Sequence, residues 1–450
     1  MNFAIVRYLI GWMLGIESIF LLLPALTAVI YGEPELPAYL IAAAISLAGA
    51  ALLCHRKPKN TRFYAREGYV TVALCWLILA VIGALPFVLS REIPFFIDAL
   101  FETVSGFTTT GATILGDVEA LSHASMLWRC LTHWVGGMGV LVFMLIVLPL
   151  AGGHTIFLMR AESPGPSVSK MSPHMRDTAT ILYAIYFGLT VLQMILLLIG
   201  GMPLFDAICV SLGTAGTGGF GNWNDSIAHY NSAYLQNVIT VFMILFGINF
   251  SAYFLILTRK FRQAFRIEEI RVYLGVIFVF AGLIAFNVRP MFGSLRESFH
   301  HALFQVASII TTTGFSTVDF DQWPTFSRAL LVLLMFIGAC AGSTGGGIKC
   351  SRILLLGKSV KKELMCLIHP RLVRVNKMDG QRVPHEVMRS INVFVVAYAF
   401  IFILSLLIIS LNCEDLVTCF TSVATTLNNV GPGLSLCGPT CNFGFFPPLS

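Results

Sequence analysis

A short glycine-centred motif occurs four times in this chain, and each copy follows a hydrophobic stretch. The copies read TTTGAT at residues 108–113, GTGGFG at 216–221, TTTGFS at 311–316 and NNVGPG at 428–433. Their central glycines lie 95 to 117 residues apart, a period that is too long for a solenoid and suits a repeated membrane hairpin. Four copies of one loop predict a pseudo-fourfold pore in which backbone carbonyls replace the water around an ion, as in a cation filter.

The central glycine of each copy is the position where a filter most needs glycine. A filter loop presents closely spaced carbonyls in a backbone conformation that most side chains forbid and that glycine adopts without steric cost. Neighbouring threonines add stiffness and further oxygens. A single copy is equally well a polar turn, but four copies at matched positions favour a filter. The predicted ion-binding residues are Thr109, Thr110, Gly111, Thr217, Gly218, Gly219, Thr312, Thr313, Gly314, Asn429, Val430 and Gly431.

The composition indicates a membrane protein. Hydrophobic residues form 56% of the 450 residues and charged residues only 12%, whereas soluble domains carry about 25% charged residues. The first apolar stretch, residues 3–31, is long enough to span a bilayer and lacks the small-residue cleavage pattern of a signal peptide. We therefore predict a multi-pass protein that is embedded in the lipid bilayer.

The net charge of +6 reflects membrane topology and does not indicate a nucleic-acid partner. If the N-terminus is cytoplasmic, the inner polar segments hold 24 of the 29 Lys and Arg residues. Cytoplasmic loops of membrane proteins are enriched in these two residues. The other five are Arg91, Arg129, Arg289, Arg296 and Arg328, which fall on the outer side or at outer helix ends. This asymmetry predicts a cytoplasmic N-terminus.

The apolar stretches predict an all-α protein made of two N-terminal helices and four pore units. Each unit is expected to contain a helix, a half-helix, a filter loop and a second helix. The expected domains are the helix pair at 1–60 and the pore units at 61–155, 156–262, 263–365 and 366–450. The expected helices span residues 3–31, 37–54, 68–89, 97–107, 125–151, 179–201, 233–257, 272–287, 326–357 and 387–411, of which 97–107 is a half-helix.

The free backbone N–H and C=O groups of a half-helix at membrane depth need hydrogen-bond partners from protein or water. A water-filled pore supplies them. Each half-helix directs the negative end of its dipole toward the pore axis, which favours a cation. Asp98, Asp206 and His301 each stand thirteen residues before the central glycine of their unit, by their numbers in the sequence. We expect them to cap the half-helices. Asp98 and Glu102 both lie on the first half-helix, where they either attract cations to the entrance or act as caps.

The whole chain resembles the TrkH/KtrB family of potassium-uptake proteins, and the two extra N-terminal helices favour the TrkH branch. The motifs that carry the resemblance are TTTGA at 108–112, THWVGGMG at 132–139, TTTGFST at 311–317, GSTGGGIK at 342–349 and TLNNVGPG at 426–433. The resemblance implies the K⁺-translocating subunit of a Trk-type uptake system in a bacterial inner membrane. It further implies a homodimer with one pore per chain, gated by a cytosolic nucleotide-binding ring. The only expected cofactor is K⁺ itself, as the transported ion.

A Na⁺-permeable relative is the first alternative to K⁺ transport. In related plant transporters a serine in place of the first filter glycine accompanies Na⁺ preference, so Gly111 favours K⁺. A polytopic membrane enzyme is the second alternative, and it would need a cluster of ionisable residues inside the bilayer. The ten histidines are scattered, and His133 is most simply a helix-packing or interfacial residue, so we predict that the chain is not an enzyme.

The glycine-rich stretch at 341–349 has two possible interpretations. It superficially resembles a phosphate-binding loop, but no glycine is followed directly by Lys and then by Ser or Thr, and the stretch interrupts an apolar run. A membrane helix broken where it lines a cavity is the better interpretation. By resemblance the loop lies beneath the filter and acts as a gate formed by Gly342, Ser343, Thr344, Gly345, Gly346, Gly347 and Lys349. Lys349 either faces the pore or marks the cytosolic boundary.

The fourth pore unit is shorter than the other three in this sequence. The sequence given ends at Ser450, nineteen positions after Gly431 by their numbers, whereas each other unit continues into a second helix. The resemblance implies one more helix here. We therefore expect the fourth repeat to stop before its second helix, and an inactive truncated subunit is a further alternative.

Overall fold

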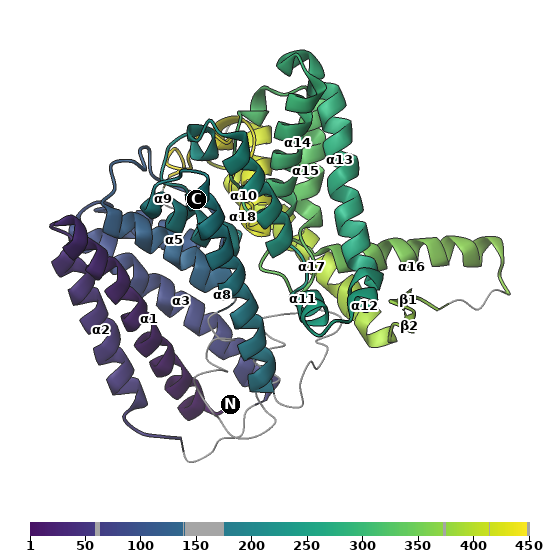
Figure 1. The fold of residues 1–450 in the computed structure, drawn as a ribbon. Coiled ribbons are helices and arrows are strands. Elements are labelled where there is room, and N and C mark those ends of the chain that lie inside the picture. The colour runs from purple at the N-terminus through teal and green to yellow at the C-terminus, as the bar shows by residue number, and fades with distance from the viewer. Residues whose placement is uncertain (59–63, 138, 140–174, 372–374, 414, 448–450) are drawn as a thin grey trace.

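The computed structural model describes residues 1–58, 64–137, 139, 175–371, 375–413 and 415–447, and these residues form a predominantly helical fold (Figure 1). The helices are α1 (Phe3–Tyr31), α2 (Leu36–Cys54), α3 (Ala65–Ser90), α4 (Phe96–Phe107), α5 (His123–Gly137), α8 (Met175–Ile199), α9 (Leu204–Gly216), α10 (Ala233–Phe246), α11 (Phe250–Leu257), α12 (Phe261–Arg266), α13 (Glu268–Phe292), α14 (Leu295–Ile310), α15 (Thr325–Ile337), α16 (Cys350–Ile368), α17 (His385–Ile409) and α18 (Leu416–Asn428). Short 3₁₀ turns are η1 (Ser226–His229), η2 (Phe320–Gln322) and η3 (Ser435–Cys437). The predicted all-α membrane class is confirmed.

Six helices within the described residues are long and apolar enough to cross a membrane, or seven if one bent pair counts as a single span. The six are α1, α2, α3, α8, α13 and α17. Their outward faces carry large apolar side chains that are mostly exposed, such as Phe286 and Phe400, which are 75% and 69% exposed. A bilayer is the surrounding in which such faces are stable. The prediction of a multi-pass membrane protein is therefore confirmed.

The two N-terminal helices pack closely as an antiparallel pair at the edge of the molecule (Figure 1). Small residues permit this approach, because a side chain at Gly11 would collide with Leu53 and Cys54 of α2. The hydroxyl of Ser46 donates a 2.8 Å hydrogen bond to the Leu14 carbonyl across the pair. The C-cap Gly32 has φ +70° and ends α1 in a left-handed turn.

Two predicted long helices are broken. The prediction of one helix over residues 233–257 is wrong, because α10 and α11 meet at 94° around the break at residues 247–249. The Asn249 side chain accepts a 2.8 Å hydrogen bond from the Ser251 N–H and so caps the new helix α11. The predicted helix 326–357 is interrupted between α15 and α16. Glycines with positive φ at 338, 342 and 347 make this break possible, since helical backbone has negative φ.

Four short helices, α4, α9, α14 and α18, lead directly into the four glycine motifs. Each of them packs against neighbouring helices, and α14, for example, packs against α13, α10 and α15. The capping prediction for Asp206 and His301 is wrong, because both side chains bond to residues beyond the filter loops. The capping bonds that are present come from other residues: Ser294 accepts from the Glu297 N–H in α14, and Asp415 accepts from the Val417 and Thr418 N–H groups in α18.

One predicted helix lies partly outside the described residues, and one small hairpin was not predicted. The predicted helix 125–151 begins as α5, but residues 138 and 140–151 are outside the described part of the chain. A small antiparallel hairpin, β1 (Lys377–Met378) and β2 (Gln381–Arg382), was not predicted. It lies beside α16, which extends sideways from the helical bundle (Figure 1).

Candidate cation filter and gate

The four glycine motifs adopt the same backbone conformation. Two residues before each central glycine, a residue with a side chain takes a left-handed conformation that is uncommon outside glycine. These residues are Thr109 at φ +56°, Thr217 at +54°, Thr312 at +60° and Asn429 at +58°. The central glycines Gly111, Gly219, Gly314 and Gly431 have φ of +76°, +78°, +85° and +94°. One loop geometry is thus built four times, from sequences as different as TTTG and NNVG.

The central glycines meet around a closed ring. A Cβ atom placed on Gly111 would collide with the carbonyl oxygen of Gly218, and one on Gly219 with that of Thr313. A Cβ on Gly314 would collide with the carbonyl oxygen of Val430. The ring closes at Gly431, where a Cβ would lie 2.9 Å from the Thr110 carbonyl oxygen. Each glycine therefore packs against the carbonyl that precedes the glycine of the following loop, and any side chain there would displace that carbonyl.

A cavity of about 130 Å³ lies on the side where the chain leaves the four loops. All four central glycines line it. Polar groups from the segments after the loops also reach it, among them Asn224, Ser316 and Asn442. The glycine ring forms the floor of this cavity, so an ion in the cavity would meet the ring directly.

Threonine hydroxyls at the loops bond within the protein. Thr108 and Thr110 share a 2.8 Å hydrogen bond, and the matching pair Thr311 and Thr313 shares one of 2.7 Å. Thr110 also donates to the Asn429 side-chain oxygen at 3.2 Å and so joins the first loop to the last. These contacts hold the loops in place. The hydroxyls are used within the protein, and the ring itself is formed by backbone carbonyls.

Asp206, in the first turn of α9, and His301, well inside α14, bond to the segments that follow the second and third glycine loops. Asp206 accepts hydrogen bonds from Asn222 at 2.7 Å, from Tyr230 at 2.7 Å and from the Trp223 indole at 3.2 Å. His301 bonds through Nδ1 to the Thr317 hydroxyl at 3.0 Å. Asn222 and Thr317 both stand three residues after their glycine by their numbers, so the two units use the same connection. Asp98 lies in the first turn of α4, where Phe95 is the N-cap residue.

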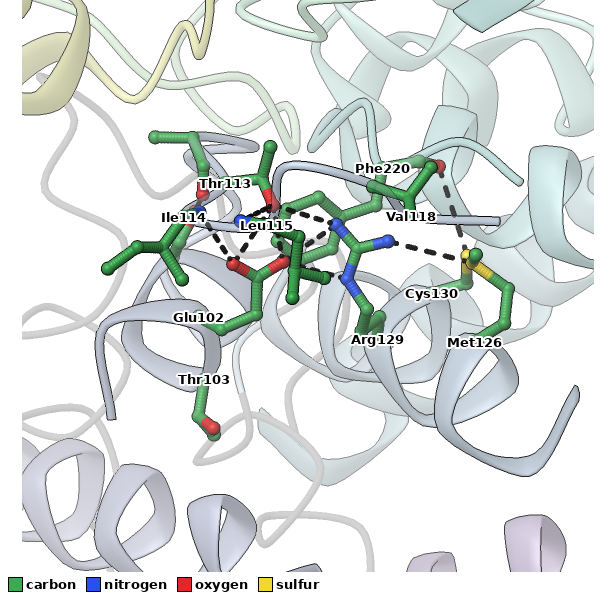
Figure 2. Close-up of polar contacts among 12 residues, drawn as sticks. Glu102, Thr103, Thr113, Ile114, Leu115, Val118, Met126, Arg129, Cys130 and Phe220 are labelled. Carbon is green, nitrogen blue, oxygen red and sulfur yellow. Dashed lines mark hydrogen bonds and ion pairs between the residues drawn. The ribbon is translucent and has the colours of Figure 1, made fainter. Parts of the chain in front are cut away.

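The first loop is held by a buried ion pair (Figure 2). Glu102 of α4 and Arg129 of α5 approach to 2.7 Å, and their side chains are 0% and 2% exposed. The carboxylate also accepts hydrogen bonds of 3.0 and 3.1 Å from the Thr113 hydroxyl and one of 3.1 Å from the Ile114 N–H. Arg129 lies 4.0 Å from the centroid of the Phe220 ring, in the second loop. The pair therefore contacts the chain just after both Gly111 and Gly219.

The sequence did not predict this pair. The sequence predicts Glu102 only as a cap or as an entrance charge, and Arg129 only as an outer positive residue. A charged residue in an apolar helix was the available signal, since buried charges in proteins are nearly always paired. His133 was predicted to be a packing residue, and it packs behind the second loop: its ring stacks on Phe220 at 4.1 Å, and Gly218 lies against the ring so closely that no Cβ would fit.

The glycine-rich break between α15 and α16 lies against the third and fourth loops. The Gly346 N–H donates a 2.6 Å hydrogen bond to the Thr312 hydroxyl. The Gly347 N–H donates to the Asn428 carbonyl at 3.0 Å. A Cβ on Gly345 would lie 2.8 Å from the Thr311 carbonyl oxygen. The break therefore contacts residues that precede the central glycines, on the opposite side of the ring from the cavity.

The break is also bonded to itself and to the other broken helix. The Lys349 ammonium donates to the Gly345 carbonyl, so this side chain turns back into the loop. Lys349 has φ +81°, an unusual conformation for a residue with a long side chain. At the break between α10 and α11, the Gly247 carbonyl accepts from the Cys340 N–H at 3.0 Å, and the Phe250 N–H donates to the Gly342 carbonyl at 2.9 Å. Backbone hydrogen bonds thus connect the break between α10 and α11 to the break between α15 and α16.

Comparison with known proteins gives one consistent family. A family model described as a cation transport protein, TrkH, matches residues 37–281 and 279–445. The Trk system potassium uptake protein TrkH of Salmonella typhimurium is 37% identical over 457 residues, which cover 100% of this chain and 94% of that protein. The Trk system potassium uptake protein TrkG of Escherichia coli is 34% identical over 434 residues, which cover 95% and 90%.

A solved structure agrees with the same family. The crystal structure of the potassium transporter TrkH from Vibrio parahaemolyticus matches with a TM-score of 0.88 at 32% sequence identity. The match covers 99% of this chain and 93% of that one. The likeness therefore extends over nearly the whole chain.

Proposed function

The chain belongs to the TrkH family of cation transport proteins, and from that premise we propose that it carries K⁺ across a membrane through the ring of Gly111, Gly219, Gly314 and Gly431. The observation that supports this proposal most directly is the closed ring itself. Each glycine packs against the carbonyl before the glycine of the following loop, around all four loops. Rings of backbone carbonyls are the groups that replace the water shell of K⁺ in selective channels.

The half-helices supply the electrostatic part of the proposed filter. The helices α4, α9, α14 and α18 all end at the filter loops, so four negative dipole ends converge there. Each helix terminus carries the equivalent of about half an elementary charge. The predicted ion-binding residues are those of the four loops: Thr109, Thr110, Gly111, Thr217, Gly218, Gly219, Thr312, Thr313, Gly314, Asn429, Val430 and Gly431. Permeation through such a ring is passive movement down the electrochemical gradient.

The charge distribution supports a bacterial inner-membrane location with the N-terminus in the cytoplasm. In that orientation the inner segments hold 24 of the 29 Lys and Arg residues. The outer cavity then faces the periplasm, and α16 with the hairpin β1–β2 faces the cytoplasm. A reporter fused after residue 1 and another in the 222–231 segment would test this: cytoplasmic activity of the first and periplasmic activity of the second are expected.

The glycine-rich break is the proposed gate. It consists of Gly342, Ser343, Thr344, Gly345, Gly346, Gly347 and Lys349. Its contacts with Thr312 and Asn428 support this role, because they hold it against the proposed filter on the side away from the cavity. On family grounds we propose that the chain forms a homodimer that binds a cytosolic nucleotide-binding ring. The segment 358–389 is rich in Lys and Arg, and it is the proposed docking site for that cytosolic partner.

Growth of a bacterium that lacks its own K⁺ uptake tests the transport proposal. Expression of this chain is expected to restore growth at limiting K⁺. Gly111→Ser is the matched variant, because it places a side chain against the Gly218 carbonyl and a serine at the position that accompanies Na⁺ preference in plant relatives. Rb⁺ and Na⁺ uptake by purified protein in vesicles then separates K⁺ transport from Na⁺ transport. Normal membrane insertion without any uptake of either ion would contradict the proposal.

A further inference from the structure

Both ends of the glycine-rich break bond to one carboxylate. Glu269, on the first turn of α13, accepts a 2.7 Å hydrogen bond from the Ala341 N–H and a 2.9 Å bond from the Ser351 N–H through the same oxygen, Oε1. Ala341 lies at the start of the proposed gate and Ser351 just after its end. Glu269 is 3% exposed. One side chain from another helix therefore holds together the two points where the gate loop begins and ends.

The local chemistry explains why a carboxylate is suited to this position. Ser351 is in the first turn of α16, where backbone N–H groups have no partner within the helix and the helix dipole favours a negative charge. The residue before that helix, Lys349, makes no side-chain capping bond. Glu269 therefore acts as the cap of α16 from outside the helix. The positive charge of Lys349 interacts with the carboxylate and offsets the cost of burying it.

The gate loop itself has little intrinsic preference for one conformation. The break that contains it, residues 338–349, has three glycines with positive φ, at 338, 342 and 347, and is neither helix nor strand. Its own backbone bonds are a 3.3 Å turn bond from the Ser343 N–H to the Cys340 carbonyl and a 2.9 Å bond from the Cys350 N–H to the Ala339 carbonyl. Glycine-rich backbone has the most conformational freedom to lose on ordering. Its position against the filter is therefore decided by the bonds that tie it to its surroundings, and the Glu269 bonds fix both of its ends.

The same turn of α13 is tied to the cytoplasmic hairpin. Glu268, the neighbour of Glu269, forms an ion pair with Lys358 of α16, and its N–H donates a 2.7 Å hydrogen bond to the Asp379 carboxylate in the turn between β1 and β2. Lys358 also donates to the Lys377 carbonyl at 2.8 Å. Figure 1 shows α12, the start of α13, α16 and the hairpin gathered at one end of the molecule. A displacement of the hairpin would thus be transmitted to the turn that holds the gate.

We propose that Glu269 is the latch of the gate: its carboxylate holds the loop 341–351 against the third and fourth filter loops, and release of these two bonds opens the pathway. Glu269 is a positioning residue in this proposal, because it acts through the loop and does not touch the ion. The proposal rests on the proposed K⁺ transport and on the proposed role of the loop as a gate.

The test compares ion flux through the purified full chain in vesicles, without any added cytosolic partner. Glu269→Ala removes the acceptor and is expected to raise basal Rb⁺ flux about tenfold, equivalent to about 1.4 kcal/mol in the closed-to-open equilibrium. Glu269→Gln keeps an oxygen that can accept both bonds but removes the charge, so its flux is expected to lie between wild type and Glu269→Ala. Glu297→Ala is the matched control, because Glu297 is also a first-turn glutamate but is exposed at the start of α14.

Two readouts separate a latch from a merely structural residue. Loss of fold lowers flux and the melting temperature together, whereas loss of a latch raises flux. Hydrogen exchange in the segment 338–351 is expected to become faster in Glu269→Ala, with exchange in α4 and α9 unchanged. Unchanged or reduced flux in well-folded Glu269→Ala would overturn the latch while wild-type flux still supported K⁺ transport. Absence of flux in wild type and all variants would instead overturn the transport proposal, and the latch would fall with it.

Discussion

Glu102 and Arg129 form a buried ion pair directly behind the first glycine loop, with 2.7 Å between Oε1 and Nη2. The two residues come from the half-helix α4 and the following helix α5, and the carboxylate also bonds to Thr113 and Ile114. In the third unit, the residue nine positions before the glycine is Gln305, whose amide lies 3.5 Å from the Val318 carbonyl. The first loop is thus held by a charged contact and the third by a neutral one.

Removal of one partner of this pair is expected to destabilise the protein strongly. Glu102→Leu leaves the Arg129 guanidinium buried without its carboxylate, and breaking a buried ion pair costs about 3–5 kcal/mol. The double variant Glu102→Leu with Arg129→Met removes both charges and is expected to recover most of that loss, since apolar replacements of a buried pair are often neutral. Thermal unfolding in detergent measures both effects.

The control for this prediction is Glu363→Leu, which removes one partner of an exposed pair. Glu363 lies 3.2 Å from Lys362 and is 65% exposed, so the expected change is within about 1 kcal/mol. Equal melting temperatures of Glu102→Leu and Glu363→Leu would show that the buried pair does not support the loop.

Gly219→Ala is expected to abolish transport. The added methyl would occupy the position of the Thr313 carbonyl oxygen, and alanine at φ +78° costs a further 1–2 kcal/mol or so. The Thr313 carbonyl would then have to move out of its position in the ring. Gly275→Ala is the matched control, because a Cβ there meets nothing within 4 Å. Rb⁺ uptake at equal membrane abundance distinguishes the two, and comparable uptake by both would contradict the carbonyl ring.

Asp206→Ala is expected to loosen the segment that follows the second filter loop. The change removes the shared acceptor of Asn222, Trp223 and Tyr230, which are half-buried, and the loss of each hydrogen bond costs about 0.5–1.5 kcal/mol. Burial and the hydrogen bond to Asp206 raise the pKa of Tyr230, so Asp206→Ala is expected to lower the pKa of this phenol. Ultraviolet titration of Tyr230 against a Tyr230→Phe baseline measures the shift. A pKa of Tyr230 that did not move would place Asp206 outside this bracing contact.

Asp415→Asn is expected to lower the melting temperature at neutral pH and to leave it unchanged in acid. Hydrogen bonds from the Thr418 hydroxyl and backbone lower the pKa of Asp415 to about 2, below the ordinary value of about 3.9 for an unfolded chain. Because the folded pKa is depressed, the carboxylate contributes stability above about pH 4, and this contribution disappears as the pH falls toward 2. Asparagine retains the cap at all pH values. Melting temperatures of the two proteins are therefore expected to differ at pH 7 and to converge by about pH 2. A difference that stayed constant over this range would rule out the carboxylate as its source.

The sequence alone determined the positions of the four central glycines and the membrane class. A glycine at the centre of four matched motifs is a requirement of local backbone geometry, and local geometry can be inferred from neighbouring residues. The positive φ at Gly111, Gly219, Gly314 and Gly431 follows that requirement. Hydrophobic runs likewise give membrane spans directly, because the thickness of the bilayer sets their length. The break in the run around 341–349 was predicted for the same reason, from its glycines.

Only the tertiary structure decided which groups hold the loops in place. Glu102 meets Arg129 across 27 residues, and Glu269 meets Ala341 and Ser351 across 72 and 82 residues. The sequence offered several charged residues in apolar surroundings, and nothing local selected among their possible partners. The capping prediction for Asp206 and His301 failed for this reason. Asp206 is in the first turn of α9, but its carboxylate bonds to Asn222, 16 residues further along the chain. His301 lies well inside α14, where Ser294 is the cap. A buried charge takes the partner that packing brings to it, and packing is a property of the whole fold.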